Sequence, residues 1–322
     1  MQYFIFGGSG FIGGHLARLI KQVRPDAEVF NLDIVPGSCG GYATYVEADV
    51  RGPIGLPPGV TPTEDDVVVN LAAVHRTPGH PDREYFETNI RGAENVTEFA
   101  ARHGVRRILF TSSIAPYGAA EERKSEDTLP TPNTPYGISK LVAEHVHRTW
   151  QAADPARQLT ILRPGVVFGH GEGGNFTRLY ESLRKHMFAF PGRRDTIKAC
   201  IYVKDLVAFA LYCLDRPGGG VELYNCTYEP AYSIDHIVRR IKAVTGLTCP
   251  TPLIPRWILM PVAYAAWCLG SPMGVCPARV RKLMISTNIC GKRMAGSGYV
   301  MRYPLDEALA DWLADSGGET LK

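Results

Sequence analysis

The sequence predicts an α/β fold, in which a parallel β-sheet is covered by helices on both faces. Through the first half of the 322 residues, short apolar segments alternate with amphipathic ones. A glycine-rich turn directly follows the first apolar segment, and Gly- and Pro-rich stretches loosen the pattern after Gly165. We therefore expect a doubly wound parallel sheet of the Rossmann type, with a smaller C-terminal substrate-binding cap over its carboxyl edge.

Strands are expected where apolar residues run without interruption, because both faces of such a sheet are buried. Six such segments occur, at residues 2–6, 27–33, 43–47, 67–71, 107–111 and 159–162. Apolar residues at helical spacing predict helices at residues 11–23, 84–103, 136–152, 205–215 and 233–245. The helix at 136–152 has a clear start, because Thr134 can cap it and Pro135 suits its first position.

The composition narrows the class of protein. With 45% apolar and 21% charged residues it is that of a globular chain, and the net charge of +3 comes from 35 basic and 32 acidic residues without a basic tract, so we expect no nucleic-acid partner. The eight cysteines contain no C-x-x-C pair, so we expect free thiols and no metal site. The first strand runs straight into the glycine turn with no secretion signal, which indicates a cytoplasmic protein.

One apolar segment, residues 257–277, contains no charged residue. Its length suits a membrane span, but Pro261, Pro272 and Gly270 interrupt it and would expose backbone groups that hydrocarbon cannot satisfy. We favour a buried or substrate-covering helix. A helix that lies on a membrane surface stays open as the alternative.

The glycine turn has the spacing of a dinucleotide-binding loop. Gly7, Gly10 and Gly13 lie at the junction of the first strand and the first helix. The backbone there can approach a pyrophosphate, and Phe11 and Ile12 contribute N–H groups at the start of the helix.

An acid follows this loop at the end of the second strand. Asp33 stands 20 residues after Gly13, where its carboxylate can accept hydrogen bonds from ribose hydroxyls and would repel a 2′-phosphate. An aspartate that merely starts a turn before Pro36 is the alternative. Asp49 and Val50, after the third strand, would lie near the adenine, and the predicted cofactor is NAD.

Three residues form a candidate catalytic group. Tyr136 and Lys140 are four residues apart on one helix face, and a positive charge beside a phenol favours its phenolate. Ser113 follows the fifth strand at the edge of the sheet where ligands bind, and can hold the substrate oxygen whose proton Tyr136 takes.

With these residues in place, the chain resembles the extended short-chain dehydrogenase/reductases, and among them the NAD-dependent epimerase/dehydratase family that modifies nucleotide sugars. The resemblance runs from Gly7 to about Leu214. Besides the loop, Asp33 and the catalytic group, it rests on Asn70-Leu71-Ala72-Ala73, Asn89-Ile90-Arg91-Gly92, Leu162-Arg163-Pro164, Phe168-Gly169 and Tyr202-Val203-Lys204-Asp205.

The resemblance implies further site residues. The cofactor would be lined by Leu71, Ala72, Ala73, His75, Pro164 and Val166, with Asn89 bracing the sheet beside it, although His75 can equally be a surface histidine. Asn175, Phe176, Arg193 and Arg279 would contact the diphosphate of the substrate.

The resemblance also implies a division of the chain and a homodimer. Residues 1–165 would bind NAD, with 200–226 returning to that domain, while 166–199 and 227–300 form the cap and 301–322 a C-terminal helix. The dimer would form through the helices at 84–103 and 136–152.

The residues after Ser113 narrow the reaction. Related dehydratases and decarboxylases carry acids there, whereas this chain has Ile114-Ala115. We therefore expect 4-epimerisation of a UDP-sugar through a transient 4-keto intermediate. A 4-dehydrogenase or 4-ketoreductase of a nucleotide sugar and a hydroxysteroid-type dehydrogenase, which would use the apolar cap, stay open. A cofactor-binding sensor without turnover is the alternative from another class.

Overall fold

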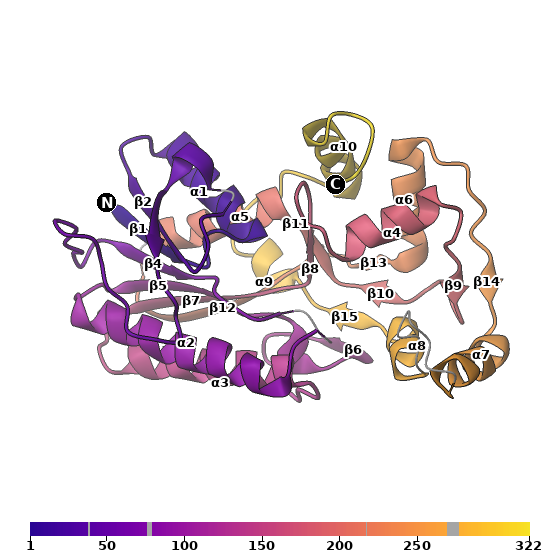
Figure 1. The fold of residues 1–322 in the computed structure, drawn as a ribbon, viewed down its shortest axis with the longest axis horizontal. Helices are drawn as coiled ribbons and strands as arrows, with labels where there is room; N and C mark the ends of the chain where they lie inside the picture. The colour runs from indigo at the N-terminus through magenta and orange to yellow at the C-terminus, as the bar shows by residue number, and fades with distance from the viewer. Residues whose placement is uncertain (38, 76–78, 217, 269–276) are drawn as a thin grey trace.

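Seven parallel strands form the main sheet, in the order β12-β7-β5-β4-β1-β2-β3 (Figure 1). Their bounds are β1 Gln2–Phe6, β2 Glu28–Asp33, β3 Thr44–Glu47, β4 Val67–Asn70, β5 Arg107–Thr111, β7 Gln158–Pro164 and β12 Gly220–Cys226. The strand order reverses between β1 and β4, the position where open α/β sheets bind ligands. The predicted doubly wound sheet is confirmed.

The coordinates are a computed structural model that describes the chain except residues 38, 76–78, 217 and 269–276. The side chains of Ala120, Ala266, Ala278, Arg279, Lys282 and Leu283 also lie outside the description.

Two pairs of helices cover the main sheet (Figure 1). On one face lie α1 Phe11–Val23 and α5 Val203–Asp215, and on the other lie α2 Asp82–Arg102 and α3 Pro135–Ala152. The strands carry the core between them, since Phe4, Phe6, Val68 and Ile161 are almost completely buried. Thr134 and Pro135 start α3 as predicted, because the Thr134 hydroxyl accepts a hydrogen bond from the Gly137 N–H at 3.1 Å.

The smaller part of the molecule holds three short sheets, ordered β13-β10-β15-β6, β11-β8 and β14-β9. Their strands are β6 Ala120–Lys124, β8 Val166–Phe168, β9 Phe190–Pro191, β10 Ile197–Lys198, β11 Cys200–Tyr202, β13 Tyr232–Ser233, β14 Leu253–Ile254 and β15 Thr287–Ile289. The helices are α4 Asn175–Arg184, α6 Ile234–Thr245, α7 Arg256–Cys268, α8 Pro277–Met284, α9 Lys292–Ala295 and α10 Leu305–Asp315. Because β6 pairs with β15, residues 120–124 join the strands of the smaller part. The division of the chain at residue 165 stays a prediction.

The apolar segment after residue 256 differs from our expectation. Helix α7 continues through Pro261, and it is not buried: Trp257 and Trp267 are 76% and 61% exposed, and only Ala263 among its described side chains is buried. A proline removes one backbone hydrogen bond, which an exposed helix can tolerate with a bend. Among the described residues, no helix is long and apolar enough to cross a membrane.

Candidate active site

The glycine loop has no room for a side chain at Gly7. Gly7 has a φ of 76°, and a Cβ at this position would lie 2.6 Å from the backbone nitrogen of Ala72. Gly10 is the N-cap of α1 in extended backbone, so the first N–H groups of the helix, from Phe11 and Ile12, have no side-chain cap. Free N–H groups at a helix start attract phosphate, so the loop fits the pyrophosphate of a dinucleotide.

Asp33 faces this loop from the end of β2. One carboxylate oxygen accepts a hydrogen bond from the Ser9 N–H at 3.0 Å, and the other accepts one from the Ile34 N–H at 2.7 Å. The second contact is the turn-starting role that we weighed as the alternative. The second oxygen also accepts the Val35 N–H at 3.4 Å, whereas the first keeps a lone pair for a ribose hydroxyl. The cofactor role of Asp33 stays a prediction.

Asn89 connects the cofactor side of the site to the catalytic helix. Its side chain accepts a hydrogen bond from the Val74 N–H at 2.8 Å and donates one to the Val74 carbonyl at 3.1 Å, which fixes the loop after Leu71-Ala72-Ala73. It also donates to the Ser139 hydroxyl on α3 at 2.8 Å. A single buried amide thus holds the loop from β4 against the turn that carries Tyr136.

Ser113 and Tyr136 come together at the carboxyl edge of the sheet. Burial raises the pKa of the Tyr136 phenol, and the neighbouring Ser113 hydroxyl opposes this shift. Gly137 makes this meeting possible, because a Cβ there would lie 2.7 Å from the Ala115 carbonyl oxygen. Only a glycine after Tyr136 lets α3 approach the loop from β5 so closely, a point that the sequence analysis missed.

Lys140 lies one turn beyond Tyr136 and is 2% exposed. Its ammonium donates to the Thr111 carbonyl at 2.6 Å and lies 4.4 Å from the centre of the Phe110 ring. Burial lowers the pKa of Lys140 to about 7, and the charge of Glu144 opposes this shift. An ammonium has three donors, so two remain for hydroxyl groups of a bound cofactor.

A buried ion pair lies below Lys140 on the same helix face. Glu144 accepts hydrogen bonds from Arg163 Nε at 2.8 Å, from an Arg163 terminal nitrogen at 2.6 Å and from the Ser112 hydroxyl at 2.5 Å. It joins α3, β7 and the end of β5 beneath the catalytic group. Sequence analysis did not single out Glu144, although its spacing of four residues from Lys140 offered a signal.

The predicted adenine-side residues have internal partners. Asp49 forms an ion pair with Arg51 at 2.6 Å, and hydrogen bonds from Arg51 hold the pKa of Asp49 below its usual range. The Val50 side chain is buried beside Gly92. Any contact from Val50 to a cofactor would therefore come from its backbone.

The nicotinamide-side residues follow their strands as expected. Pro164 ends β7 in the core, and Val166 is half-buried at the start of β8. His75 is exposed after β4. The structure thus leaves their predicted cofactor contacts as predictions.

The candidate diphosphate ligands do not converge on one point. The Phe176 side chain stacks on Phe168 in the core at 4.3 Å, so only its backbone can meet a substrate. The Glu172 carboxylate accepts the N–H groups of Phe176 and Thr177 at the start of α4. Asn175 is exposed there and keeps its side-chain amide for a ligand.

The structure describes the side chain of only one of the two candidate arginines, Arg193. Arg193 pairs with Asp195 at 2.6 Å and with Glu121 at 3.0 Å, so a diphosphate would compete with two carboxylates for its charge. Arg279 lies on α8, but its side chain lies outside the described residues.

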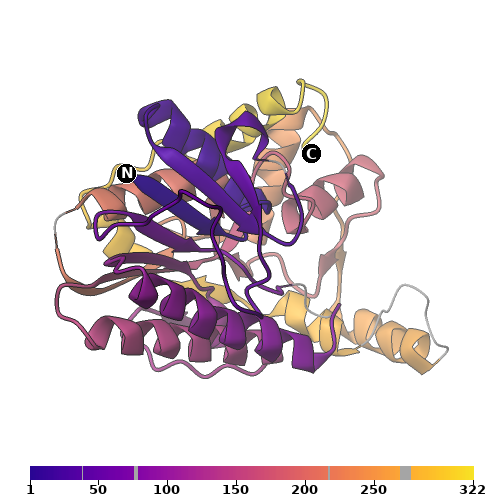
Figure 2. The same ribbon diagram turned by 60° about the vertical axis from the view of Figure 1, so that its left-hand side comes forward.

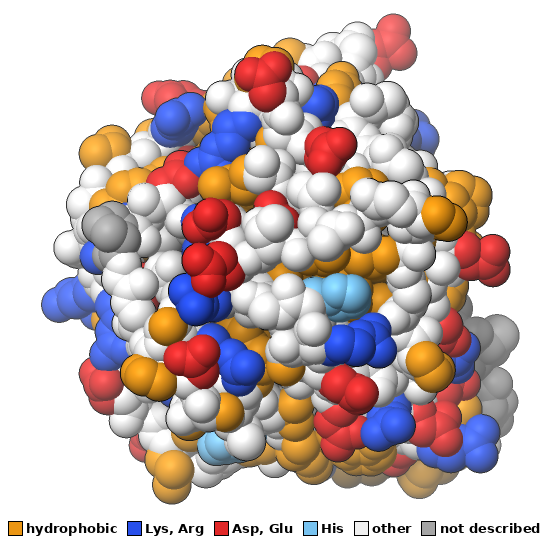
Figure 3. Space-filling view, turned by 90° about the vertical axis from the view of Figure 1, so that its left-hand side faces the viewer, with side chains coloured by type: hydrophobic (Ala, Val, Ile, Leu, Met, Phe, Trp, Pro, Cys, Tyr) orange, Lys and Arg blue, Asp and Glu red, His pale blue; other side chains and the backbone are white. Residues whose placement is uncertain are grey.

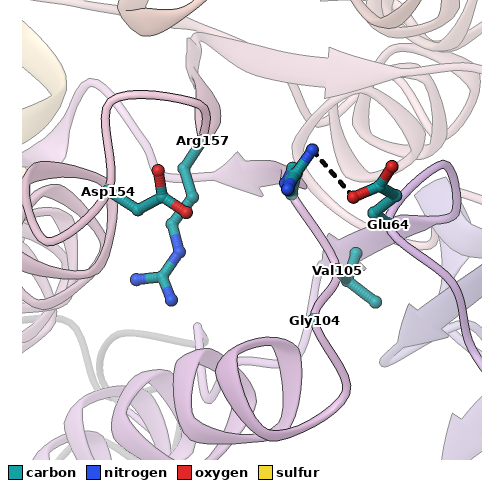
Figure 4. A pocket seen from close by; sticks show the side chains of 6 residues that line it. Glu64, Gly104, Val105, Asp154 and Arg157 are labelled. Carbon is teal, nitrogen blue, oxygen red and sulfur yellow. Dashed lines mark ion pairs between the residues drawn. The ribbon is translucent and has the colours of Figure 1, made fainter.

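A cavity of about 310 Å³ lies at the opposite edge of the sheet. It is lined by residues that precede β4, β5 and β7, among them Glu64, Arg106 and Asp154, with an ion pair between Arg106 and Glu64 at 2.8 Å (Figure 4). The catalytic group follows the strands instead. This cavity is therefore unrelated to the candidate active site.

The fold and site define a class: a Rossmann-fold enzyme with a dinucleotide cradle and a Ser-Tyr-Lys group at the carboxyl edge. The model of the NAD dependent epimerase/dehydratase family matches residues 3–227. The chain belongs to this family, and its cofactor is NAD, as the sequence predicted.

Individual relatives agree with this assignment. The chain is 31% identical over 310 residues to N-acetyl-alpha-D-glucosaminyl-diphospho-ditrans,octacis-undecaprenol 4-epimerase of Escherichia coli O157:H7, covering 95% of this chain and 92% of that protein. It is 29% identical to UDP-glucose 4-epimerase of Neisseria gonorrhoeae, covering 80% and 86%. The solved structure of MoeE5 in complex with UDP-glucuronic acid and NAD is 25% identical, with a TM-score of 0.75 and coverage of 98% and 100%.

Proposed function

We propose that this protein is an NAD-dependent 4-epimerase of a sugar carried on a diphosphate. The observation that carries the proposal is the placement of Ser113 after β5 and of Tyr136 and the buried Lys140 on α3, at the carboxyl edge of the sheet. The neighbouring Ile114 and Ala115 supply no acid for dehydration or decarboxylation. The related 4-epimerases support the same reaction.

In this mechanism, Tyr136 takes the proton of the sugar 4-hydroxyl while Ser113 donates a hydrogen bond to the same oxygen. Lys140 favours the phenolate of Tyr136 by its charge. When bound, NAD would supply a reversible hydride acceptor for C4 of the sugar. The same residues then act in reverse: Tyr136 gives the proton back to the oxygen at C4, now of inverted configuration.

The carrier of the sugar has two candidates. A UDP-sugar is supported by the relatives that act on UDP-glucose and by the structure with UDP-glucuronic acid. A polyprenyl diphosphate is supported by the Escherichia coli relative, whose similarity covers 95% of this chain, against 80% for the Neisseria gonorrhoeae enzyme. The exposed apolar α7 favours the second carrier.

We further propose a cytoplasmic homodimer that pairs α2 and α3 with the same helices of a second copy. These helices lie side by side on one face of the sheet (Figure 1). Ile138 and Val142 of α3 are 39% and 37% exposed, and such apolar side chains favour burial against a partner. Sedimentation velocity checks this state: a single monomeric species would contradict it.

The proposed function is tested by incubating the purified protein with NAD and UDP-linked or polyprenyl-diphosphate-linked N-acetylglucosamine. We expect inversion at C4 without accumulation of NADH on at least one carrier. Stoichiometric NADH without inversion would instead identify a dehydrogenase. The absence of turnover on both carriers would count against the proposal.

A further inference from the structure

Helix α7 exposes an apolar surface that water does not favour. We call the side chains of Trp257, Ile258, Val262, Tyr264 and Trp267 the α7 face; they are 40% to 76% exposed. A helix that is apolar all round normally lies in a core or against a membrane. Figure 2 shows α7 at the edge of the molecule, extending away from the main sheet beyond α8. Nothing within the described part of the chain covers this face.

The charge around the α7 face is entirely basic along the sequence. Residues 236–305 contain no Asp or Glu, although the chain as a whole nearly balances its charges. The basic residues of this stretch are Arg239, Arg240, Lys242, Arg256, Arg279, Arg281, Lys282, Lys292, Arg293 and Arg302. By contrast, acidic and basic side chains mingle over the end of the molecule seen in Figure 3. This stretch therefore differs from the rest of the chain, in which acidic and basic residues are interspersed.

Two of these cations flank the α7 face. Arg256 begins α7, and Arg281 of α8 donates a hydrogen bond to the Tyr264 hydroxyl at 3.0 Å. Neither forms an ion pair with a described side chain, whereas Arg239 and Arg293 pair with acids at 2.8 Å. The two cations beside the apolar surface are thus left for an external anion.

Helix α8 and the start of α7 pack beside the turn at Gly192. A Cβ on Gly192 would lie 2.5 Å from Met284 of α8 and 3.8 Å from the Arg256 side chain. Both helices therefore rest on the turn that leads into Arg193, a candidate diphosphate ligand. The apolar surface and the predicted diphosphate site share one support.

The strand after α8 leads to the catalytic loop. Ile289 of β15 packs in a small buried cluster with Tyr117 and Ala199, and Ile114 lies at its edge. Ile114 directly follows Ser113 in the chain. The polypeptide that leaves α8 thus packs beside the loop that carries Ser113.

We propose that the α7 face docks on the surface of an anionic phospholipid bilayer. With 13 residues, α7 is about 20 Å long, shorter than the roughly 30 Å hydrocarbon core, so it lies in the interface. Trp and Tyr side chains favour this depth, and Arg256 and Arg281 would meet lipid phosphates. The purpose of docking, to present a polyprenyl-linked sugar to the site, rests on the proposed function, but the docking itself does not.

Flotation with vesicles tests the proposal directly. We expect the full chain to float with vesicles of equimolar phosphatidylglycerol and phosphatidylcholine, and to bind weakly to phosphatidylcholine alone or at high salt. Its fluorescence should shift to shorter wavelength, because Trp257 and Trp267 are exposed whereas Trp150 and Trp312 are already buried. Both signals come from the same helix that the proposal names.

Substitutions on α7 test whether this helix itself makes the contact with lipid. Trp257→Ser combined with Trp267→Ser should lower vesicle affinity by at least about tenfold. Leu129→Ser is the matched control, because Leu129 is 79% exposed but lies outside α7, and it should float like the parent. No flotation with either vesicle overturns the proposal, as does equal flotation of the double variant. A change from dimer to monomer in the double variant without vesicle binding would show that a second copy covers α7, and would also overturn it.

The failure of docking and the failure of the epimerase proposal are distinguishable. Inversion of a UDP-sugar in free solution with no flotation retains the reaction and removes the membrane. Flotation without inversion of either carrier retains the membrane and removes the reaction.

Discussion

Helices α3 and α7 depart from the usual distribution of side chains in opposite directions. Helix α3 buries Lys140, Glu144 and His147, each no more than 2% exposed, whereas α7 leaves two tryptophans in water. Each arrangement costs free energy unless a partner offsets it. The polar side chains of α3 find theirs inside the chain, while the described residues offer none that covers α7. Helix α3 therefore organises the catalytic group within the protein, whereas α7 presents a surface for a partner outside it.

The largest effect is expected at the phenol of α3. Replacing Tyr136 with phenylalanine removes the group that moves the proton, so kcat should fall by about 10²–10⁴-fold. Thermal stability should change little, because the substitution removes one hydroxyl and keeps the ring. Steady-state kinetics check this, with Tyr45→Phe on the exposed β3 as the control. Retention of full activity by Tyr136→Phe would remove the proposed mechanism.

The second effect is expected at the buried ion pair. Glu144→Gln leaves the Arg163 guanidinium buried without its counter-charge, which costs about 3–5 kcal/mol of unfolding free energy. Urea denaturation measures the loss. Glu122→Gln is the control, because the Glu122 side chain is 83% exposed and its pair with Lys124 should contribute at most about 1 kcal/mol. If both variants lost the same small amount of unfolding free energy, Arg163 would not need Glu144 as its counter-charge, which would contradict the prediction.

A smaller effect is expected on the stability of the protein at acidic pH, through His147 of α3. Burial lowers the pKa of His147 to about 4, and its neutral ring accepts a hydrogen bond from Asn70 at 3.3 Å and donates one to the Ala143 carbonyl at 2.7 Å. Between pH of about 6.5 and 4 the unfolded chain binds a proton here that the folded chain does not, so His147 lowers stability as the pH falls.

The same measurement made on a variant isolates this group. His147→Gln should make the loss of stability between neutral and mildly acidic pH shallower, as followed by urea midpoints at several pH values. His145→Gln is the control on the exposed face of α3, and its pH dependence should match the parent. Identical slopes in all three proteins would contradict the account of His147.

The smallest effect is expected on α7. Because the α7 face has no partner within the described chain, Trp257→Ser with Trp267→Ser should change the unfolding free energy by no more than about 0.5 kcal/mol for each substitution. Urea denaturation without lipid checks this. A loss of several kcal/mol would show that these tryptophans pack in the fold, and the contrast between the two helices would disappear.

Much of the fold could be predicted from the sequence, because its signals are local. The strands from 2–6 to 107–111 and helices 11–23 and 136–152 follow from apolar runs, periodicity and the Thr134 cap, and they lie within one or two residues of the observed bounds. Strand β6 was not predicted, since Ala120–Lys124 carries four charged residues and forms a strand only because β15 returns to pair with it. Pairing between residues so far apart leaves no local pattern.

The candidate site also contains features that local sequence predicts and features that depend on contacts in space. The glycine loop, Asp33 and the Tyr136–Lys140 pair follow from spacing along the chain, and the structure places each at the carboxyl edge of the sheet. The roles of Glu144 and Gly137 depend on what α3 meets in space: Arg163 from β7 and the Ala115 carbonyl. The exposure of α7 was mispredicted because apolar composition alone cannot tell a core from an external surface.

The central claim, a hydride that leaves C4 and returns to it, is tested most directly with a sugar diphosphate deuterated at C4. The substrate is the carrier, UDP or polyprenyl, that supports turnover, and the product is analysed by mass spectrometry and NMR. We predict a product of inverted configuration that keeps the deuterium at C4, with no net NADH. Loss of the deuterium to water, or its recovery in accumulated reduced cofactor, would contradict the account.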